Sequence, residues 1–403
     1  MVRTDTPYFG WRVVWAAFTI AIFAWGIGFY GPGIFLEALH DRHGWSVSLI
    51  SAAITTHFLL GALLVARFPA VEARLGIVCV VLLGGGLTTL GLLGWSSATQ
   101  PWQIFAAAIF SGAGWALTSG ASINAMVTPW FDGRRPAAIA LAFNGASMGG
   151  VIFAPLWALL IHQWGFPLAG AVIAAATLAV MSLLALLFLR QTPQNLGVAA
   201  DPPAPRPIGA MDAPSLPPGR AIWGEPRFLS LCAGFSLGAA ALVGLLAHLF
   251  SLLAPTLGPF GAGLALSLIT ICAVIGRTLL AWALPVGADR RRAGAWNFAL
   301  QALGTLILLM ALDVSAPLLL LGCVVVGLTV GNMLSLPPMI AQVEFTRADV
   351  GRVVALVTAV NQATYALTPG GFGLLRDLSG SGAAVLVAAA LLQAASALIL
   401  FRR

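Results

Sequence analysis

The sequence predicts an all-α membrane protein in which twelve membrane-spanning helices form two pseudo-symmetric six-helix bundles. Three observations lead to this fold class. The 403 residues are 60% hydrophobic and 8% charged, a composition that does not suit a single water-soluble core. The apolar residues gather in stretches of about twenty, the length of a helix that crosses a bilayer. A proline-rich segment divides these stretches into two sets.

The predicted spans are hydrophobic on nearly every side, as is typical of helices in lipid, and they lack the alternating pattern of a β-barrel. Six of them precede the proline-rich segment and six follow it. In order along the chain they cover residues 11–36, 47–69, 77–97, 103–129, 136–163, 166–189, 228–254, 261–285, 294–312, 316–343, 351–375 and 382–401.

Residues 190–227 are predicted to form a cytoplasmic linker. The segment is rich in proline and carries scattered charges, and such a composition does not form a packed core. We therefore divide the chain into an N-terminal six-helix bundle, residues 1–189, the linker, and a C-terminal six-helix bundle, residues 228–403.

A weak internal repeat suggests that the two bundles are related. The turn Gly133-Arg134-Arg135 is followed by Asn144 in the first half, and Gly351-Arg352 is followed by Asn361 in the second. Parallel repeats of six helices around a central cavity are a known plan for transporters. The repeat therefore favours a membrane protein with a site between its halves.

The distribution of arginine predicts the topology. All basic residues are arginine, and with both termini in the cytoplasm every one except Arg42, Arg277 and Arg376 falls in or beside a cytoplasmic segment. This is the bias that sets the orientation of membrane proteins. We expect a multi-pass protein of the cell's inner (cytoplasmic) membrane whose first apolar segment is an uncleaved helix. The net charge of +7 then follows from topology and predicts no nucleic-acid partner.

Arg277 is the strongest functional signal in the sequence. It lies inside Leu264–Leu284, a stretch with no other charge, and none of the 13 acidic residues lies near the middle of an apolar segment. A guanidinium at that depth costs from a few to about ten kcal/mol unless an anion compensates it. In one interpretation the anion is a substrate, which a planar guanidinium binds through two parallel hydrogen bonds. In the other, Arg277 pairs with an acid from another helix or lies at the cytoplasmic mouth.

Other polar and aromatic side chains within the spans could line a central cavity or join helices together. Histidine titrates near neutral pH, so His57 and His248 are candidates for proton coupling. His57 could instead donate to a neighbouring helix backbone, His248 could be an interface residue, and Tyr30 could belong to an aromatic belt. The candidates for substrate binding beside Arg277 are Tyr365, Asn361, Gln362, Tyr30, His57, Trp115, Ser119 and Asn332.

Several motifs resemble those of a known family. The run Trp130-Phe131-Asp132-Gly133-Arg134-Arg135-Pro136-Ala137, leading into Asn144-Gly145-Ala146-Ser147-Met148-Gly149-Gly150, resembles the region between the fourth and fifth helices of the major facilitator superfamily. Phe9-Gly10-Trp11-Arg12-Val13-Val14 and Gly44-Trp45-Ser46 are similar to the oxalate/formate antiporter and monocarboxylate transporter branch. So is Gly276-Arg277, where members of that branch carry a substrate-binding arginine. The resemblance covers nearly the whole chain and implies the major facilitator fold.

Departures from the family pattern narrow the expected substrate. Some members of the branch carry an aspartate one turn before the arginine, where this chain has Ala273. Members that bind dicarboxylates carry a lysine in the eleventh helix, and this chain has no lysine at all. The resemblance therefore implies one carboxylate per substrate.

The family also carries charged latches in the loops between helices. Here Glu72 takes the place of the usual aspartate after the second helix, and Arg74 follows it. The resemblance implies that these residues hold the two halves in one access state. The expected gating residues are Glu72, Arg74, Asp289, Arg290, Arg134 and Arg135.

The sequence thus predicts a secondary active or facilitative transporter that moves a small organic anion, with a monocarboxylate favoured, by alternating access with Arg277 binding the carboxylate. The alternative is an exporter of a larger anionic metabolite or drug of the same superfamily. Proton coupling, anion exchange and uniport all remain open. We expect a monomer in the bilayer, with no cofactor and no metal. An enzyme is disfavoured because no His-rich, paired-acid or phosphate-binding motif is present.

Overall fold

The computed structural model describes residues 8–198, 219–285, 288–346 and 349–402, and every regular element within them is helical. Two of the sequence predictions, the linker and the distribution of arginine, concern some residues outside these ranges. The middle of the predicted linker lies outside the described residues, as do Arg3, Arg206, Arg347, Arg403 and the side chain of Arg220.

Seventeen helical elements follow one another within the described ranges. Those of the first half are α1 (Gly10–Gly28), α2 (Gly31–His43), α3 (Val47–Val65), α4 (Phe68–Ser97), α5 (Pro101–Thr118), α6 (Gly120–Val127), the 3-10 turn η1 (Thr128–Trp130), α7 (Arg135–Leu184) and the π-helical turn η2 (Ala185–Leu189). Those that follow are η3 (Gly219–Gly224), α8 (Pro226–Ala283), α9 (Arg290–Ala311), α10 (Ala316–Val330), α11 (Asn332–Glu344), α12 (Val350–Ala366), α13 (Thr368–Ser379) and α14 (Ala383–Phe401).

These elements build the twelve predicted spans. Nine stretches of the described chain are long and apolar enough to cross a membrane, and two of them, α7 with η2 and α8, each hold two spans. The predicted connections near residues 163–166 and 254–261 are not loops. Each is a single glycine with positive φ, Gly165 at 74° and Gly258 at 71°, a conformation that glycine adopts without strain. Helices α12 and α13 supply the eleventh span.

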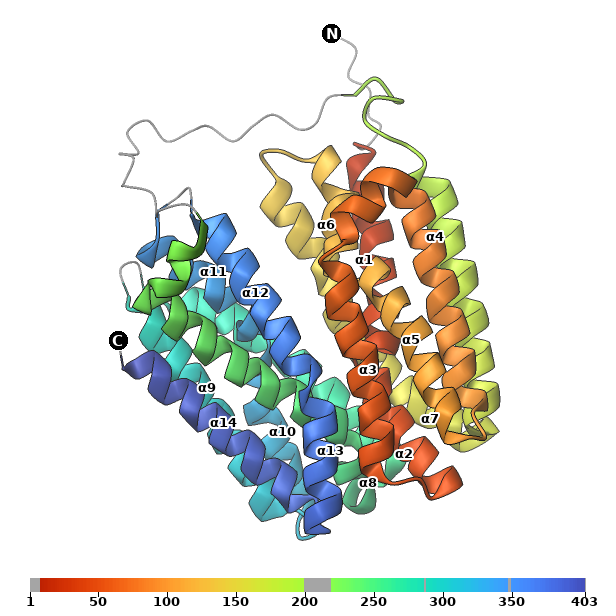
Figure 1. The fold of residues 1–403 in the computed structure, drawn as a ribbon, viewed down its shortest axis with the longest axis vertical. Coiled ribbons are helices and arrows are strands. Elements are labelled where there is room, and N and C mark those ends of the chain that lie inside the picture. The colour runs from red at the N-terminus through yellow and green to blue at the C-terminus, as the bar shows by residue number, and fades with distance from the viewer. Residues whose placement is uncertain (1–7, 199–218, 286–287, 347–348, 403) are drawn as a thin grey trace.

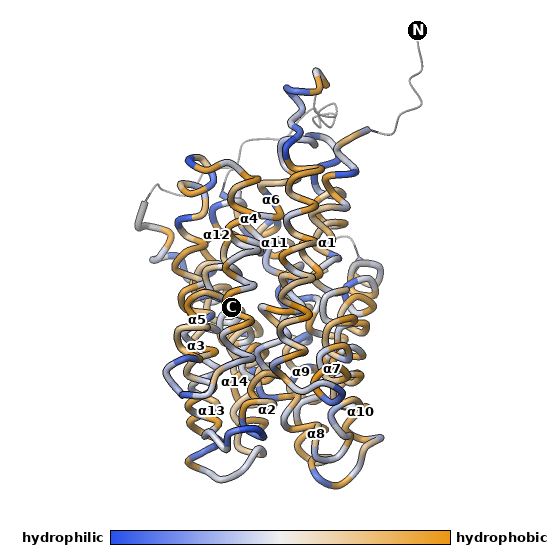
Figure 2. Tube along the Cα trace, turned by 90° about the vertical axis from the view of Figure 1, so that its right-hand side faces the viewer, coloured by the Kyte–Doolittle hydropathy of each residue, from blue (hydrophilic) through white to orange (hydrophobic). Residues whose placement is uncertain are grey.

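The helices form two bundles with an apolar middle. Figure 1 shows α1 to α7 on one side and α8 to α14 on the other, with residues 190–198, which follow η2, at one end. In Figure 2 hydrophobic residues run along the helices, whereas hydrophilic residues gather at the two ends. This band of apolar surface is what a bilayer requires of a helical protein.

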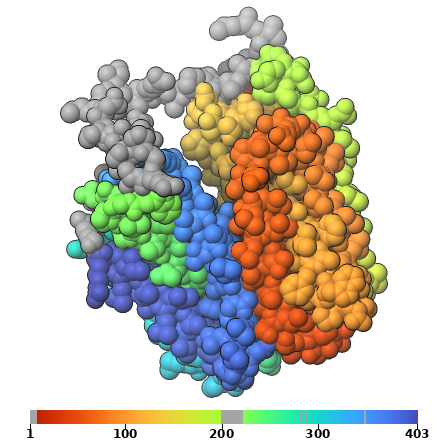
Figure 3. All heavy atoms as spheres, viewed as in Figure 1, coloured from red at the N-terminus to blue at the C-terminus, as the bar shows by residue number. Residues whose placement is uncertain are grey.

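The two halves touch at one end and part at the other. We call the end that carries residues 128–134 and 190–198 the linker end, and the opposite end, with residues 44–46 and 380–382, the far end. Figure 3 shows the halves in contact toward the far end and separated by a hollow toward the linker end. A site between the halves is therefore reached from the linker end.

Hydrogen bonds join the halves toward the far end. The Gly370 N–H donates to Thr55 Oγ1 at 2.8 Å, and Ser267 Oγ donates to the Val151 carbonyl at 2.8 Å. Both bonds link a helix of the first half to one of the second. Opening the far end must break them.

Asp377 makes a further contact at the far end, beyond the apolar part of its span. Its Oδ2 accepts from the Ser48 N–H, in the first turn of α3, at 2.8 Å. Partial burial raises the pKa of the Asp377 carboxyl, but hydrogen bonds from Ser48 and Val47 and the charge of Arg376 outweigh this and lower the pKa. The contact is therefore fully present above the ordinary carboxyl pKa and is lost as pH falls through the lowered one.

Candidate functional site

Arg277 lies where α8 and the span built from α10 and α11 cross in close contact. A Cβ at Gly276 would overlap the Leu328 carbonyl, and one at Gly331 would overlap the Ala273 carbonyl. Because both positions are glycine, the two backbones touch, as in other membrane helix pairs with small residues at the contact. The contact places Arg277 beside Gly331, where α10 ends and α11 begins.

The guanidinium of Arg277 is held at one nitrogen. Its Nε donates to the Gly331 carbonyl at 3.1 Å, and the side chain is partly exposed. Among the described residues no carboxylate lies within ion-pair distance of it. Within the described ranges the terminal nitrogens of Arg277 have no hydrogen-bond partner, and a pair of guanidinium nitrogens has the geometry to hold a carboxylate.

The first half contributes Tyr30 to the same place. Tyr30 lies between α1 and α2, and its ring covers Gly150 of α7, where a Cβ would come 2.7 Å from the ring. The same Cβ would come 2.6 Å from Thr270 Oγ1 of α8, so the Tyr30 ring and Thr270 lie together. Thr270 is two turns from Arg277 on one face of α8, so residues from both halves meet on the face of α8 that carries Arg277.

An aromatic row runs from Tyr30 across the interface. The ring centroid of Phe29 lies 5.2 Å from that of Tyr30 and 6.2 Å from that of Phe58. Phe58 of α3 in turn lies 5.9 Å from Tyr365 of α12, edge to face. Gln362 lies one turn before Tyr365 on α12. Of the predicted site residues, Tyr30 and Tyr365 thus lie at this interface, with the apolar faces of Phe29 and Phe58 between them.

Two other candidates on the second half contact neighbouring helices. Asn361 Oδ1 accepts from Ser236 Oγ of α8 at 2.8 Å. Asn332 is buried, and its Nδ2 donates to Asn297 Oδ1 of α9 at 2.8 Å. These contacts lie within one bundle, so both amides join helices.

Trp115 and Ser119 lie inside the first half, at a second break in a span. Trp115 packs edge to face on Trp25 with centroids 4.9 Å apart, and Ser119 separates α5 from α6. This break is in the fourth span and the break at Gly331 is in the tenth, which are corresponding positions in two six-helix repeats. Interrupted spans at corresponding positions point to a binding site between the repeats.

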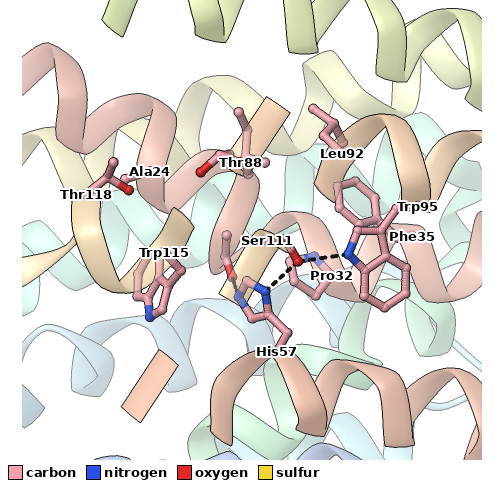
Figure 4. Close-up of a pocket in the computed structure, with 12 residues that line it drawn as sticks. Ala24, Pro32, Phe35, His57, Thr88, Leu92, Trp95, Ser111, Trp115 and Thr118 are labelled. Atoms are coloured by element: carbon pink, nitrogen blue, oxygen red, sulfur yellow. Dashed lines mark hydrogen bonds between the residues drawn. The ribbon is translucent and has the colours of Figure 1, made fainter. Parts of the chain in front are cut away.

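A small cavity of about 10 Å³ is enclosed in the first half, with His57 in its wall (Figure 4). His57 Nε2 contacts the Gly28 carbonyl at 3.0 Å, and Nδ1 contacts Ser111 Oγ at 2.8 Å. Trp95 Nε1 donates to the same Ser111 oxygen at 3.0 Å. A carbonyl can only accept, so we assign the proton to Nε2 and let Ser111 donate to Nδ1. A neutral His57 then satisfies every partner, which favours a packing role.

His248 also makes its contact within one bundle. It is fully buried on α8, and its Nε2 contacts the Pro369 carbonyl of α13 at 3.0 Å. The bond joins the seventh span to the eleventh, next to the break at Leu367 between α12 and α13. This geometry fits a helix-packing residue.

The predicted gating residues of the second half lie at the linker end, where Asp289 caps α9. Its Oδ1 accepts from the N–H groups of Arg291 and Arg292 at 3.0 and 3.1 Å. Arg291, and not the predicted Arg290, forms the ion pair between helices, with Glu344 at 2.6 Å. Both partners belong to the second half, so this pair does not cross between the halves.

The predicted gating residues of the first half have their described contacts within that half. Arg135 pairs with Asp132 three residues earlier at 3.0 Å, and both side chains are exposed, whereas Arg134 begins the same turn before α7. Among the described residues, Glu72 and Arg74 form no ion pair. Their role as a latch stays a prediction for another conformation.

The sequence matches the family description Major Facilitator Superfamily over residues 13–369. The chain belongs to the major facilitator superfamily. The fold agrees, since the solved structure of the nucleoside transporter NupG superposes with a TM-score of 0.74 at 12% identity, covering 98% of each chain. A bacterial homolog of the human lysosomal transporter Spinster, inward-facing and occupied, has a TM-score of 0.70 at 13% identity, covering 98% of this chain and 95% of that one.

Relatives of this major facilitator protein include monocarboxylate transporters. Monocarboxylate transporter 13 of Bos taurus is 28% identical over 281 residues, which are 68% of this chain and 61% of that protein. Monocarboxylate transporter 11 of Homo sapiens is 30% identical over 212 residues, 50% of this chain and 42% of that protein. The matches thus span less than two thirds of these relatives. The family and the relatives are transporters, which confirms the prediction of a membrane transporter and not an enzyme.

Proposed function

We propose that this protein carries a small organic anion with one carboxylate across the cytoplasmic membrane, and that Arg277 binds the carboxylate. One observation carries the proposal above the others. Arg277 lies at the interface of the halves and is partly exposed, and in the part of the chain that the structure describes its one hydrogen bond runs from Nε to the Gly331 carbonyl. Its paired terminal nitrogens offer a two-pronged match to one carboxylate. The names of the monocarboxylate transporter relatives support the same substrate class.

The transport cycle follows from the charge balance at this site. An empty carrier holds an uncompensated guanidinium at mid-membrane, which is costly when the site is closed off from water. A bound carboxylate neutralises it. The occupied carrier therefore passes through the closed state more readily than the empty one, while the two halves rock about the site.

The described conformation fits one end state of that cycle. Hydrogen bonds close the far end, and the halves part at the linker end (Figure 3). We place the linker end in the cytoplasm because the arginines concentrate there. In this proposal the structure is the inward-open state. The anion enters or leaves at the linker end, between helices α1 and α6 of the first half and helices α11 and α12 of the second.

Counterflow of labelled monocarboxylates in proteoliposomes tests the function. We expect saturable exchange with the unaltered protein, and an increase in KM of at least about ten-fold for Arg277→Lys, because lysine loses the two-pronged bond. Arg277→Ala should abolish exchange. The control is Arg292→Ala, whose side chain is 74% exposed at the linker end and whose removal should leave exchange unchanged.

Two outcomes would overturn the proposal. Absence of saturable flux with any small organic anion would remove the substrate class, and full activity of Arg277→Ala would remove the role of the guanidinium. If larger anions were transported and short carboxylates were not, the result would favour the alternative, an exporter of a larger anionic metabolite. An imposed pH gradient separates the coupling modes, because it drives accumulation of the anion only in proton symport.

A further inference from the structure

The break in the tenth span leaves backbone carbonyls that need partners. The last carbonyls of a helix have no partner within it, and inside a membrane no water replaces that partner. Between α10 and α11, three such oxygens are paired with side chains. Asn332 Nδ2 donates to the Leu328 carbonyl at 3.2 Å, Asn297 Nδ2 to the Thr329 carbonyl at 3.3 Å, and Arg277 Nε to the Gly331 carbonyl at 3.1 Å.

Asn297 holds this break from both sides. Its Nδ2 donates to the Thr329 carbonyl before the break, and its Oδ1 accepts from Asn332 Nδ2 after it. Asn297 and Asn332 are 6% and 5% exposed, so water does not readily replace either bond. An apolar side chain at 297 would leave the Thr329 carbonyl with one side-chain donor fewer, and would leave Asn332 Nδ2 with the Leu328 carbonyl but without the shorter bond to α9. The shape of the break then depends on one amide of α9.

The shape of the break decides where the guanidinium points. Gly331 packs directly on α8, where a Cβ would come within 3.3 Å of Arg277 Cβ. A small displacement of Gly331 therefore moves the carbonyl that holds Nε. With Nε fixed, the terminal nitrogens of Arg277 can face the other half, where Tyr30 lies. Without that bond the long side chain samples many rotamers, and binding an anion must order it again.

We infer that Asn297 is a positioning residue for the anion site, which with Asn332 fixes the break at Gly331 so that the Gly331 carbonyl orients Arg277. The inference rests on the proposed function only where it concerns substrate affinity. The hydrogen bond between Arg277 and Gly331 exists without any substrate. It can be measured separately.

The first arm of the test observes the Arg277 side chain directly. The full-length protein labelled with ¹⁵N-arginine in detergent gives side-chain Nε–H signals, and the signal missing in Arg277→Lys identifies Arg277. We expect Asn297→Leu to shift this signal and to accelerate its exchange with solvent by at least about ten-fold, the effect of losing one buried hydrogen bond. Asn297→Ser, which keeps a hydroxyl, should give a smaller change and serves if the leucine variant fails to fold.

The matched control is Gln393→Leu. Gln393 is also a fully buried amide of the second half, and its Oε1 accepts from Thr305 at 2.8 Å, away from the break. Its removal should lower stability by a similar amount and leave the Arg277 signal in place. An unchanged Arg277 signal in both Asn297 variants, or an equal change in Gln393→Leu, would overturn the inference.

The second arm uses counterflow of the transported monocarboxylate. Asn297→Leu should raise KM by about ten-fold with a smaller change in maximal rate, whereas Gln393→Leu should leave KM unchanged. An effect of Asn297→Leu on maximal rate alone would overturn the positioning role. If the unaltered protein transports no monocarboxylate, the proposed function fails, and the Arg277 signal alone decides the inference.

Discussion

The contact between α8 and α10 can be tested by adding one methyl group at Gly276. In Gly276→Ala the new Cβ would lie 2.6 Å from the Leu328 carbonyl carbon and 2.8 Å from its Cα. Non-bonded carbons rest about 3.5–4.0 Å apart. The helices must therefore separate by about 1 Å at this point, since neither backbone can turn away. Arg277 and Gly331 lie within one turn of the contact.

The size of the effect follows from two opposing terms. Forcing a methyl group into close-packed helices costs about 1–3 kcal/mol, whereas replacing glycine by alanine inside a helix stabilises it by about 0.5–1 kcal/mol. We expect a net loss of stability between zero and about 2.5 kcal/mol. A separation of about 1 Å also lengthens the Arg277–Gly331 bond beyond hydrogen-bonding range, because it now measures 3.1 Å. Affinity for the anion should fall about ten-fold.

Thermal unfolding in detergent and counterflow in proteoliposomes measure these two effects. The control is Gly86→Ala in α4, where a Cβ would meet nothing within 4 Å. That variant should be as stable as the unaltered protein or slightly more so, with unchanged KM. Equal stability and equal KM for the two alanine variants would refute the argument that close contact at Gly276 positions Arg277.

Three further predictions concern contacts away from the central site. Glu344→Gln should destabilise the protein by about 3–5 kcal/mol, because it leaves the buried Arg291 without a counter-charge. Asp132→Asn, in the exposed pair with Arg135, should change stability by less than about 1 kcal/mol. Similar unfolding temperatures for the two variants would contradict this difference. Ser111→Ala should lower stability by about 1–3 kcal/mol and leave the pH profile of transport unchanged. If transport by His57→Gln lost its dependence on pH, that result would contradict the packing role of His57. In a protein without its native cysteines, Asp377→Ala should speed alkylation of a Ser51→Cys site up to about five-fold, since Ser51 is buried against Gly373. The difference should hold from about pH 5 to 8 and vanish only in acid. An alkylation rate independent of residue 377 would show that the Asp377–Ser48 contact does not hold the far end closed.

The sequence was sufficient for the spans and for the central cation. Length and hydropathy predict the twelve spans, because a helix must be apolar wherever lipid surrounds it. Arg277 can also be singled out from the sequence, because a charged residue inside an apolar span is costly and therefore indicates a functional site. Tyr30 and Tyr365 were found among other polar residues of the spans, and the structure places these two at the interface of the halves.

Other features depend on packing between segments far apart in the chain. Asn297 lies near the start of the ninth span and carries no pattern that separates it from any other polar residue. Its role follows only from the Thr329 carbonyl, 32 residues away. Arg291 and Arg290 are likewise equivalent in sequence, and the helical position of α9 decides which of them faces Glu344. Such pairings need the three-dimensional register of the helices.

The far end and the central site are joined through Tyr30. Opening the far end requires the halves to separate there, which breaks the bonds of Thr55 and Asp377. The same movement draws Tyr30 of the first half away from Thr270 and Arg277 of the second. An empty site would then lose its neighbours while keeping its charge, whereas under the proposed function a carboxylate on Arg277 would keep that charge balanced throughout. A bound anion would thus lower the barrier to the movement at the step where the described residues offer no counter-ion.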